Sequence, residues 1–231
     1  MKTLLATLAL GLATAFMPQQ AAASATIYVG HGVNGEDLGL PSELPVDVAV
    51  DGGCLLTGVP FGTISDPVEG LDPGPYEVEI SLSDGACGGA LVMTSRVDLA
   101  FGETATVIAH LDQNMTLKIS KFTNKVAAPG RKHSRLTVHH LAAAPEVLVK
   151  LKRFSSGKIS LIRGLTNGSQ SFPAVVRDGG YRLAIFPAGT TKPRHALFRT
   201  NLHLDGNTSY FGYAVGSAEN GLTVLVLAVP G

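Results

Sequence analysis

An internal repeat places the strongest constraint on the fold of this chain. The stretch GVPFGTIS returns later as GLTNGSQS, and three residues keep their spacing: Gly58, Gly62 and Ser65 match Gly164, Gly168 and Ser171. Tyr76, before VEI, likewise has a counterpart in Tyr181, before LAI. A repeat with a period of about 105 residues indicates two copies of one domain, because self-similarity at a fixed period marks tandem structural units.

Each copy has the pattern of a β domain. TIYV, VDVAV, YEVEISL and TATVIAH alternate apolar with other residues, as expected for strands with one buried face. Glycine and proline are abundant, at 27 and 13 residues, and place turns between these segments. We therefore predict an all-β chain of two tandem antiparallel β-sandwich domains, residues 26–122 and 134–231, joined by a linker at 123–133.

The repeated glycines are predicted to be structural turn residues. A phosphate-binding loop needs a lysine after its second glycine, and Thr63 occupies that position. A glycine pair that recurs in register with strands instead indicates a shared backbone requirement for positive φ. His31 and His140 end the first strand of each copy, and we expect each imidazole to hydrogen-bond the backbone of the turn that follows.

The first 25 residues have the pattern of an export signal. Lys2 is their only charged residue, residues 4–16 form an apolar run, and residues 21–25 are small, as in a cleavable signal peptide. We expect cleavage after Ala23 or Ala25 and a periplasmic or extracellular mature protein. No later stretch reaches the roughly 18 uninterrupted apolar residues that indicate a membrane-spanning helix, so we expect no transmembrane segment in the mature chain.

Cys54 and Cys87 are the only two cysteines, and both lie in the first copy. An exported protein folds in an oxidising compartment, where thiols form disulfides. We therefore predict a disulfide between Cys54 and Cys87 rather than two free thiols. Two cysteines without a Cys-x-x-Cys pair make a poor zinc site, and we expect no bound metal.

The first copy resembles a known bacterial family. VDVAVDG from Val46 and the turn VPFG from Val59 follow His31, and this order is similar to that of the secreted domain-of-unknown-function family numbered 4397. The segment between His31 and Val46 is longer and more acidic than in that family. The second copy resembles it through His140, the pair Ala144–Pro145 and the strand VLVKLKR. The resemblance implies immunoglobulin-like sandwiches and no assigned catalytic activity.

Neither copy contains a recognisable catalytic motif. The sequence has no Gly-x-Ser-x-Gly elbow and no His-Glu-x-x-His helix, two motifs that mark common hydrolase sites. The seven histidines do not show a helical His-x-x-x-His spacing, which favours structural or surface roles over metal binding. We therefore expect a non-enzymatic protein without a cofactor.

The net charge of zero conceals a strong asymmetry between the copies. Residues 26–122 contain 14 acidic and 3 basic side chains, whereas residues 123–231 contain 4 acidic and 14 basic ones. Such a dipole can hold the two domains together, pair chains head to tail, or attract an acidic polymer to the basic domain. For the last case the candidate patch is Arg131, Lys132, Lys150, Lys152, Arg153 and Lys158. Lys150 and Lys152 are two residues apart on a predicted strand and should share one face.

Three functions are open at this point. The preferred one is an exported, non-enzymatic β-sandwich protein that binds a protein or an envelope polymer, or has a structural role in the cell envelope. A polyanion-binding protein that uses the basic second domain is one alternative, and a hydrolase with a site between the domains is another. No nucleic-acid partner is expected.

Overall fold

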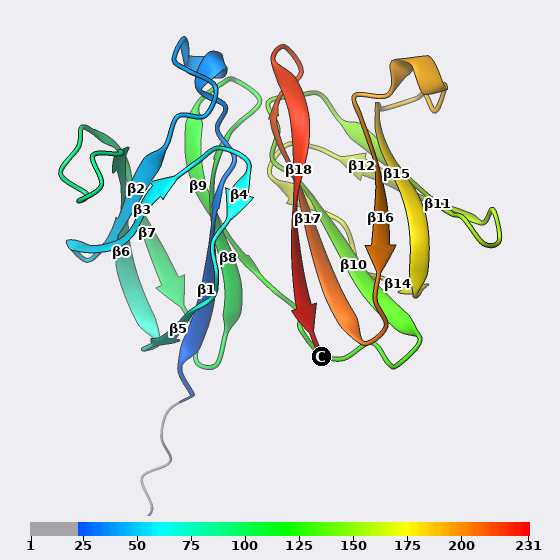
Figure 1. Cartoon of the computed structure of the whole chain (residues 1–231), viewed down its shortest axis with the longest axis horizontal. Helices are drawn as coiled ribbons and strands as arrows, with labels where there is room; N and C mark the ends of the chain where they lie inside the picture. The colour runs from blue at the N-terminus through cyan, green and yellow to red at the C-terminus, as the bar shows by residue number, and fades with distance from the viewer. Residues whose placement is uncertain (1–22) are drawn as a thin grey trace, which may run out of the picture.

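The structure is a computed structural model that describes residues 23–231 (Figure 1). The expected signal peptide, residues 1–25, therefore lies outside the described residues except for its last three. Strands β1–β9 form two sheets and strands β10–β18 form two more, so each half of the chain is a sandwich. The predicted all-β fold of two tandem immunoglobulin-like sandwiches is confirmed.

Sheets A and B form the first sandwich. Sheet A has the order β4-β1-β8-β9, with β5 also paired to β1, and sheet B has the order β3-β2-β6-β7. The strands of sheet A are β1 (Ala25–His31), β4 (Thr63–Ile64), β5 (Val68–Leu71), β8 (Thr104–Leu111) and β9 (Leu117–Thr123). Those of sheet B are β2 (Val46–Val50), β3 (Gly53–Val59), β6 (Gly74–Leu82) and β7 (Leu91–Leu99). A short 3-10 helix, η1 (Gly35–Leu38), follows β1.

Sheets C and D form the second sandwich with the same strand order. Sheet C has the order β13-β10-β17-β18, with β14 also paired to β10, and sheet D has the order β12-β11-β15-β16. The strands of sheet C are β10 (His133–His140), β13 (Ser169–Gln170), β14 (Ala174–Arg177), β17 (Thr208–Ser217) and β18 (Gly221–Pro230). Those of sheet D are β11 (Val147–Arg153), β12 (Ile159–Leu165), β15 (Gly179–Pro187) and β16 (Phe198–Leu204). A second 3-10 helix, η2 (Pro193–His195), lies between β15 and β16.

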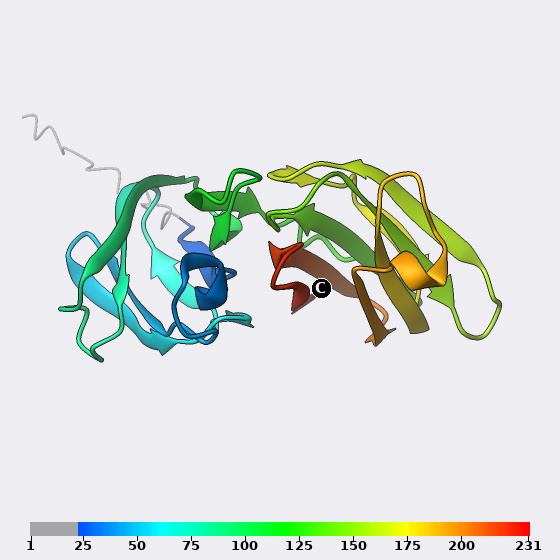
Figure 2. The same ribbon diagram turned by 90° about the horizontal axis from the view of Figure 1, so that it is seen from above.

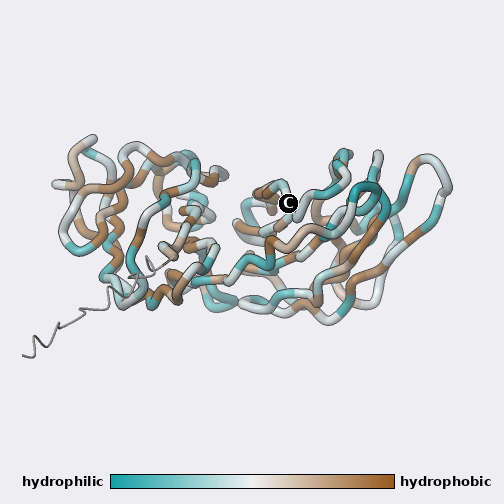
Figure 3. Tube along the Cα trace, turned by 90° about the horizontal axis from the view of Figure 1, so that it is seen from below, coloured by the Kyte–Doolittle hydropathy of each residue, from teal (hydrophilic) through white to brown (hydrophobic). Residues whose placement is uncertain are grey.

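Residue alternation along the strands fills the two cores. In β11, Val147, Val149 and Leu151 are buried in the core of the second sandwich, whereas Lys150 and Lys152 point away from it. Figure 3 shows the same alternation of hydrophobic and hydrophilic residues along the strands of both halves. This period of two places every charged side chain of such a strand on one face of the sheet.

The sheets differ in one respect from the purely antiparallel prediction. β1 pairs with β8 in parallel, and β10 pairs with β17 in parallel. In each half the chain passes through the opposite sheet before it returns beside its first strand, and such a crossover allows two neighbouring strands to run in the same direction.

The repeated glycines tie a crossover segment to the first strand of each sandwich. The N–H of Gly62 donates to the carbonyl oxygen of His31 at 2.9 Å, and the N–H of Gly168 donates to that of His140 at 2.7 Å. The four glycines of the repeat all have positive φ, at 64°, 85°, 70° and 81° for Gly58, Gly62, Gly164 and Gly168. A side chain at these positions would be strained, because L-residues rarely adopt this conformation.

His31 and His140 fix the loop that follows each first strand. The Nε2 of His31 donates to the carbonyl oxygen of Leu44 at 2.9 Å, and the Nε2 of His140 donates to that of Pro145 at 3.0 Å. Both rings are buried, and burial lowers the pKa of each imidazole because it disfavours the charged form. The two histidines are therefore neutral and bond backbone.

The two sandwiches pack on each other through sheets A and C, which gives four layers in the order B, A, C, D (Figures 1 and 2). All ten residues of β17 are buried, because one face of this strand enters its own core and the other meets sheet A. The side chains of the contact form one apolar cluster that includes Ile108, Phe211, Tyr213, Val215 and Leu225. The boundary proposed as an alternative hydrolase site is thus filled by packed side chains.

The contact between the halves uses hydrogen bonds between neutral groups and one carboxylate rather than ion pairs. The hydroxyl of Tyr213 donates to Thr106 Oγ1 at 2.7 Å, and Asp37 Oδ1 accepts a hydrogen bond from the hydroxyl of Ser217 at 2.6 Å. Within residues 23–231, each of the four ion pairs joins residues of one half. The expected charge pairing of the two domains within one chain is therefore wrong, because the strand faces that meet are apolar.

The predicted disulfide between Cys54 and Cys87 is present. It joins β3 to the loop between β6 and β7 and holds this loop against sheet B. Asp47 fixes the same loop, since its carboxylate accepts hydrogen bonds from Ser83 Oγ at 2.6 Å and from the N–H of Cys87 at 3.0 Å. Burial raises the pKa of Asp47, but these hydrogen bonds and the one from Gly58 outweigh it and hold the pKa well below its ordinary value.

Reduction of the disulfide should destabilise the first sandwich by about 3 kcal/mol, because an open chain between Cys54 and Cys87 gains conformational entropy on unfolding. The 33-residue separation sets this magnitude. Urea unfolding of oxidised and reduced protein measures the difference, and the intact mass should rise by two hydrogen atoms on reduction. Two thiols that react with an alkylating agent in unreduced, denatured protein would rule the bridge out.

Candidate anion-binding groove

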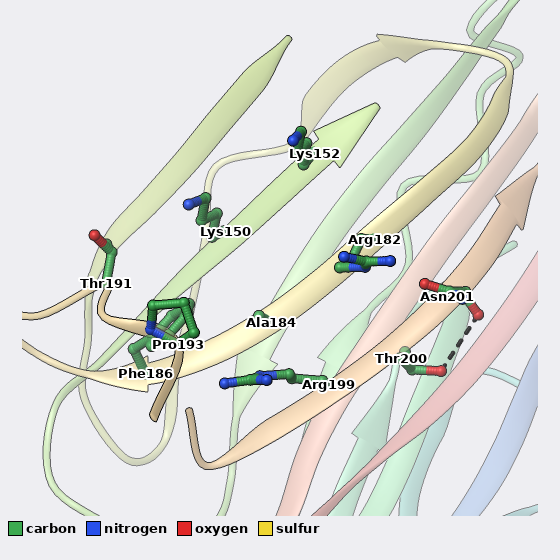
Figure 4. Close-up of a pocket in the computed structure, with 10 residues that line it drawn as sticks. All are labelled: Lys150, Lys152, Arg182, Ala184, Phe186, Thr191, Pro193, Arg199, Thr200 and Asn201. Carbon is green, nitrogen blue, oxygen red and sulfur yellow. Dashed lines mark hydrogen bonds between the residues drawn. The ribbon is translucent and has the colours of Figure 1, made fainter. Parts of the chain in front are cut away.

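The outer face of sheet D carries a basic groove. It is a concave volume of about 510 Å³, and it opens to solvent on the side of the sheet that faces away from sheet C (Figure 4). The lining residues come from β11, β15, β16 and the loop between β15 and β16. They are Lys150, Lys152, Arg182, Ala184, Phe186, Thr191, Pro193, Arg199, Thr200 and Asn201.

The register of sheet D brings the four cations of the groove together. Lys152 lies opposite Arg182 in the β11–β15 pair, and Lys150 lies opposite Ala184. Ala184 in turn lies opposite Arg199 in the β15–β16 pair. Neighbouring strands are about 4.8 Å apart, so that Lys150 and Arg199 flank the small side chain of Ala184 at a backbone separation of about 10 Å.

No carboxylate compensates these charges. The second half has four acidic residues, Glu146, Asp178, Asp205 and Glu219, and none of them lines the groove. None of the four ion pairs within residues 23–231 includes a cation of the groove. Uncompensated cations over a concave surface attract anions and raise their local concentration.

Lys152 and Arg182 lie directly opposite each other on neighbouring strands. Like charges in this position destabilise a sheet, and a bound anion relieves the repulsion. The guanidinium of Arg182 also lies over the ring of Phe154, 5.9 Å from its centroid. This cation–π contact holds the charge near the groove while leaving its N–H groups free to donate.

The loop between β15 and β16 forms one wall of the groove. It contains η2, and its Thr191 and Pro193 line the groove. Ala196 of this loop packs on the apolar cluster of Leu148, Ala184 and Phe186 under the same end. The groove therefore has a polar, basic end and an end closed by apolar contacts.

The structure brings only two of the six predicted patch residues into one site. Lys150 and Lys152 share a face of β11 and line the groove, as their spacing predicts. The guanidinium of Arg153, on the opposite face, donates to the carbonyl oxygen of Asp178 at 2.7 Å. The other three lie outside the groove: Arg131 and Lys132 precede β10, and Lys158 lies in the turn before β12.

Arg182 and Arg199 are the residues that the sequence-based patch misses. Both are exposed positions of alternating strands, YRLAIFP in β15 and FRTNLHL in β16. The alternation alone identifies them as outward-facing. Their place beside Lys150 and Lys152 depends on the pairing of β11 with β15 and of β15 with β16, which lie far apart in the sequence.

Two searches of the described part of the chain are negative. Among residues 23–231, no group of three or more His, Cys, Asp or Glu side chains is placed to hold a metal ion. In the same range, no helix has both the length and the apolar character needed to cross a membrane.

Comparison with solved structures gives low similarity. A protein from Bacteroides uniformis ATCC 8492, provisionally named as a cell adhesion protein, is 9% identical with a TM-score of 0.25, over 92% of this chain and 99% of its own. A leucine-rich repeat protein from Bacteroides thetaiotaomicron VPI-5482 is 12% identical with a TM-score of 0.24, over 84% of this chain and 26% of its own. Pneumolysin is 10% identical with a TM-score of 0.21, over 68% and 38%. These scores carry no argument about function.

A comparison with protein families is decisive for the first half. No curated protein matches the chain, but residues 25–150 match the family described as "Domain of unknown function (DUF4397)". The match covers the first sandwich and continues through β10 into β11, so that a separate family copy in the second half stays a prediction. Because more than half of the 231 residues match, the protein belongs to the DUF4397 family.

Proposed function

We propose that the protein is exported and non-enzymatic, and that it binds an anionic partner through the groove on sheet D, either as a binding protein or as a structural protein of the cell envelope. The observation that carries the proposal is the set of four cations, Lys150, Lys152, Arg182 and Arg199, on a concave surface without a carboxylate. The signal-like residues 1–25 and the disulfide support export, because disulfides persist in oxidising compartments.

Retention on a sulfated polymer tests the groove. The protein should bind immobilised heparin, used as a generic polyanion, and elute as salt shortens the Debye length from about 10 Å at 0.1 M to about 3 Å at 1 M. The double variant Arg182→Glu and Arg199→Glu should elute at clearly lower salt, and its dependence of log affinity on log salt should fall by about one per lost contact.

The double variant Arg131→Glu and Lys132→Glu is the matched control, since it changes the net charge equally at exposed positions outside the groove. It should retain most of the affinity. Equal losses in both double variants would show that net charge rather than the groove is responsible. A wild-type protein that passes through the column at low salt would refute the proposal.

A further inference from the structure

We propose that the occupant of the groove is the acidic outer face of sheet B of a second copy of this chain, so that copies associate head to tail. This proposal rests on the proposed function, because it names the anionic partner of the same groove. Sheets B and D are equivalent sheets of the two sandwiches, built from β3-β2-β6-β7 and β12-β11-β15-β16 respectively. Their outer faces can therefore be compared position by position.

Two contacts align the sheets independently. Val50 lies opposite Val78 in sheet B, as Leu151 lies opposite Leu183 in sheet D. The hydroxyl of the tyrosine two residues before Val78 or Leu183 also donates to the carbonyl oxygen four residues earlier, at 2.8 Å and 2.6 Å. The residue after Val50 thus corresponds to the residue after Leu151, and the residue before Val78 corresponds to the one before Leu183.

Charge is inverted at these corresponding outward positions. Asp51 stands where sheet D has Lys152, and Glu77 stands where it has Arg182. Glu79 lies two residues further along β6 on the same outer face. The acidic row of sheet B and the basic row of sheet D thus have the same register and spacing with opposite sign, and one face can oppose the other charge by charge.

The acidic face is accessible and ordered. Asp51 and Glu77 are exposed, and Asp51 Oδ1 accepts the N–H of Glu77 at 2.7 Å, which fixes this carboxylate beside β6. Arg96 is the one cation of the neighbouring strand on this face, and it lies 3.8 Å from Asp98, which compensates its charge. The face is therefore net negative at the positions that correspond to the groove.

The two faces lie at opposite ends of the molecule. Sheets B and D are the outermost of the four layers, with sheets A and C between them (Figures 1 and 2). Contact of face B with face D leaves one unmatched face on each copy, so the association is heterologous and extends into a chain instead of closing as a dimer. An external polymer would use only the groove, and it would leave the matching acidic face unexplained.

Sedimentation velocity of the mature chain tests the proposal. At low salt the weight-average mass should rise with protein concentration, and at about 1 M salt it should fall to that of the monomer as the charges are screened. Glu77→Gln with Glu79→Gln neutralises one face, and Lys150→Gln with Arg182→Gln neutralises the other. Each double variant alone should self-associate about tenfold more weakly, because two charge pairs are lost.

An equimolar mixture of the two double variants gives the sharpest result. The intact groove of one variant can bind only the intact acidic face of the other, so the mixture should form dimers and no larger species. Arg131→Gln with Lys132→Gln is the control and should assemble like the wild type. A wild-type protein that stays monomeric at low salt yet binds heparin would overturn self-association and leave the groove for an external polymer; a monomer that also fails to bind heparin would overturn both proposals.

Discussion

Replacing Tyr213 with alanine is expected to lower the free energy of unfolding by about 3–5 kcal/mol, which is the cost of removing a large buried aromatic side chain. Tyr213 is completely buried between the sandwiches. Its ring stacks on that of His139 with the centroids 4.4 Å apart, and its hydroxyl donates to Thr106 Oγ1 at 2.7 Å. The substitution therefore leaves a cavity in the contact that joins the two halves.

Urea unfolding of the full chain measures this effect. Tyr213→Phe is the matched control: it removes only the hydroxyl and should cost about 1 kcal/mol, since the amide of Asn124 still donates to Thr106 Oγ1 at 2.9 Å. The loss in the alanine variant should be the same at low and high salt, because the contact is apolar. A loss below about 1 kcal/mol, or one that grows at low salt, would contradict this account of the contact.

Acidification is expected to destabilise the protein by about 3 kcal/mol through His139 alone. His139 is buried beside Tyr213 and Phe122, at centroid distances of 4.4 Å and 4.6 Å. Burial lowers its pKa from 6.5 to about 4 because it disfavours the charged imidazole. The unfolded chain therefore binds a proton more readily than the folded one, and stability is full above pH 6.5 and falls as the pH decreases towards about 4.

Chemical denaturation at a series of pH values between 7 and 4 measures this dependence. His139→Phe keeps the aromatic contact but cannot take up a proton, and it should remove most of the His139 contribution. Acid sensitivity from His31, His110 and His140 should persist, because burial lowers the pKa of each. His195→Gln at an exposed position should leave the profile unchanged. A His139→Phe profile identical to that of the wild type would show that this ring does not control acid stability.

The sequence predicts individual strand faces well and their partners poorly. The spacing in VLVKLKR places Lys150 and Lys152 on one face, and the register of β11 agrees. It does not identify Arg182 and Arg199 as their neighbours, because strand pairing joins residues that are distant in the chain. The same limit applies to Arg131 and Lys132, which are close to the groove residues in sequence and lie outside the groove in the structure.

The sequence by itself determines the repeated β-sandwich plan, the disulfide between Cys54 and Cys87 and the opposite charge of the two halves. These features depend on residue alternation, glycine conformation and residue type, all of which are local. Only the tertiary structure decides which faces meet: sheets A and C bury Ile108, Phe211 and Tyr213 between the sandwiches, and the charged faces of sheets B and D remain outside. Burial of apolar surface governs that choice, because exposed charges gain little by pairing in water.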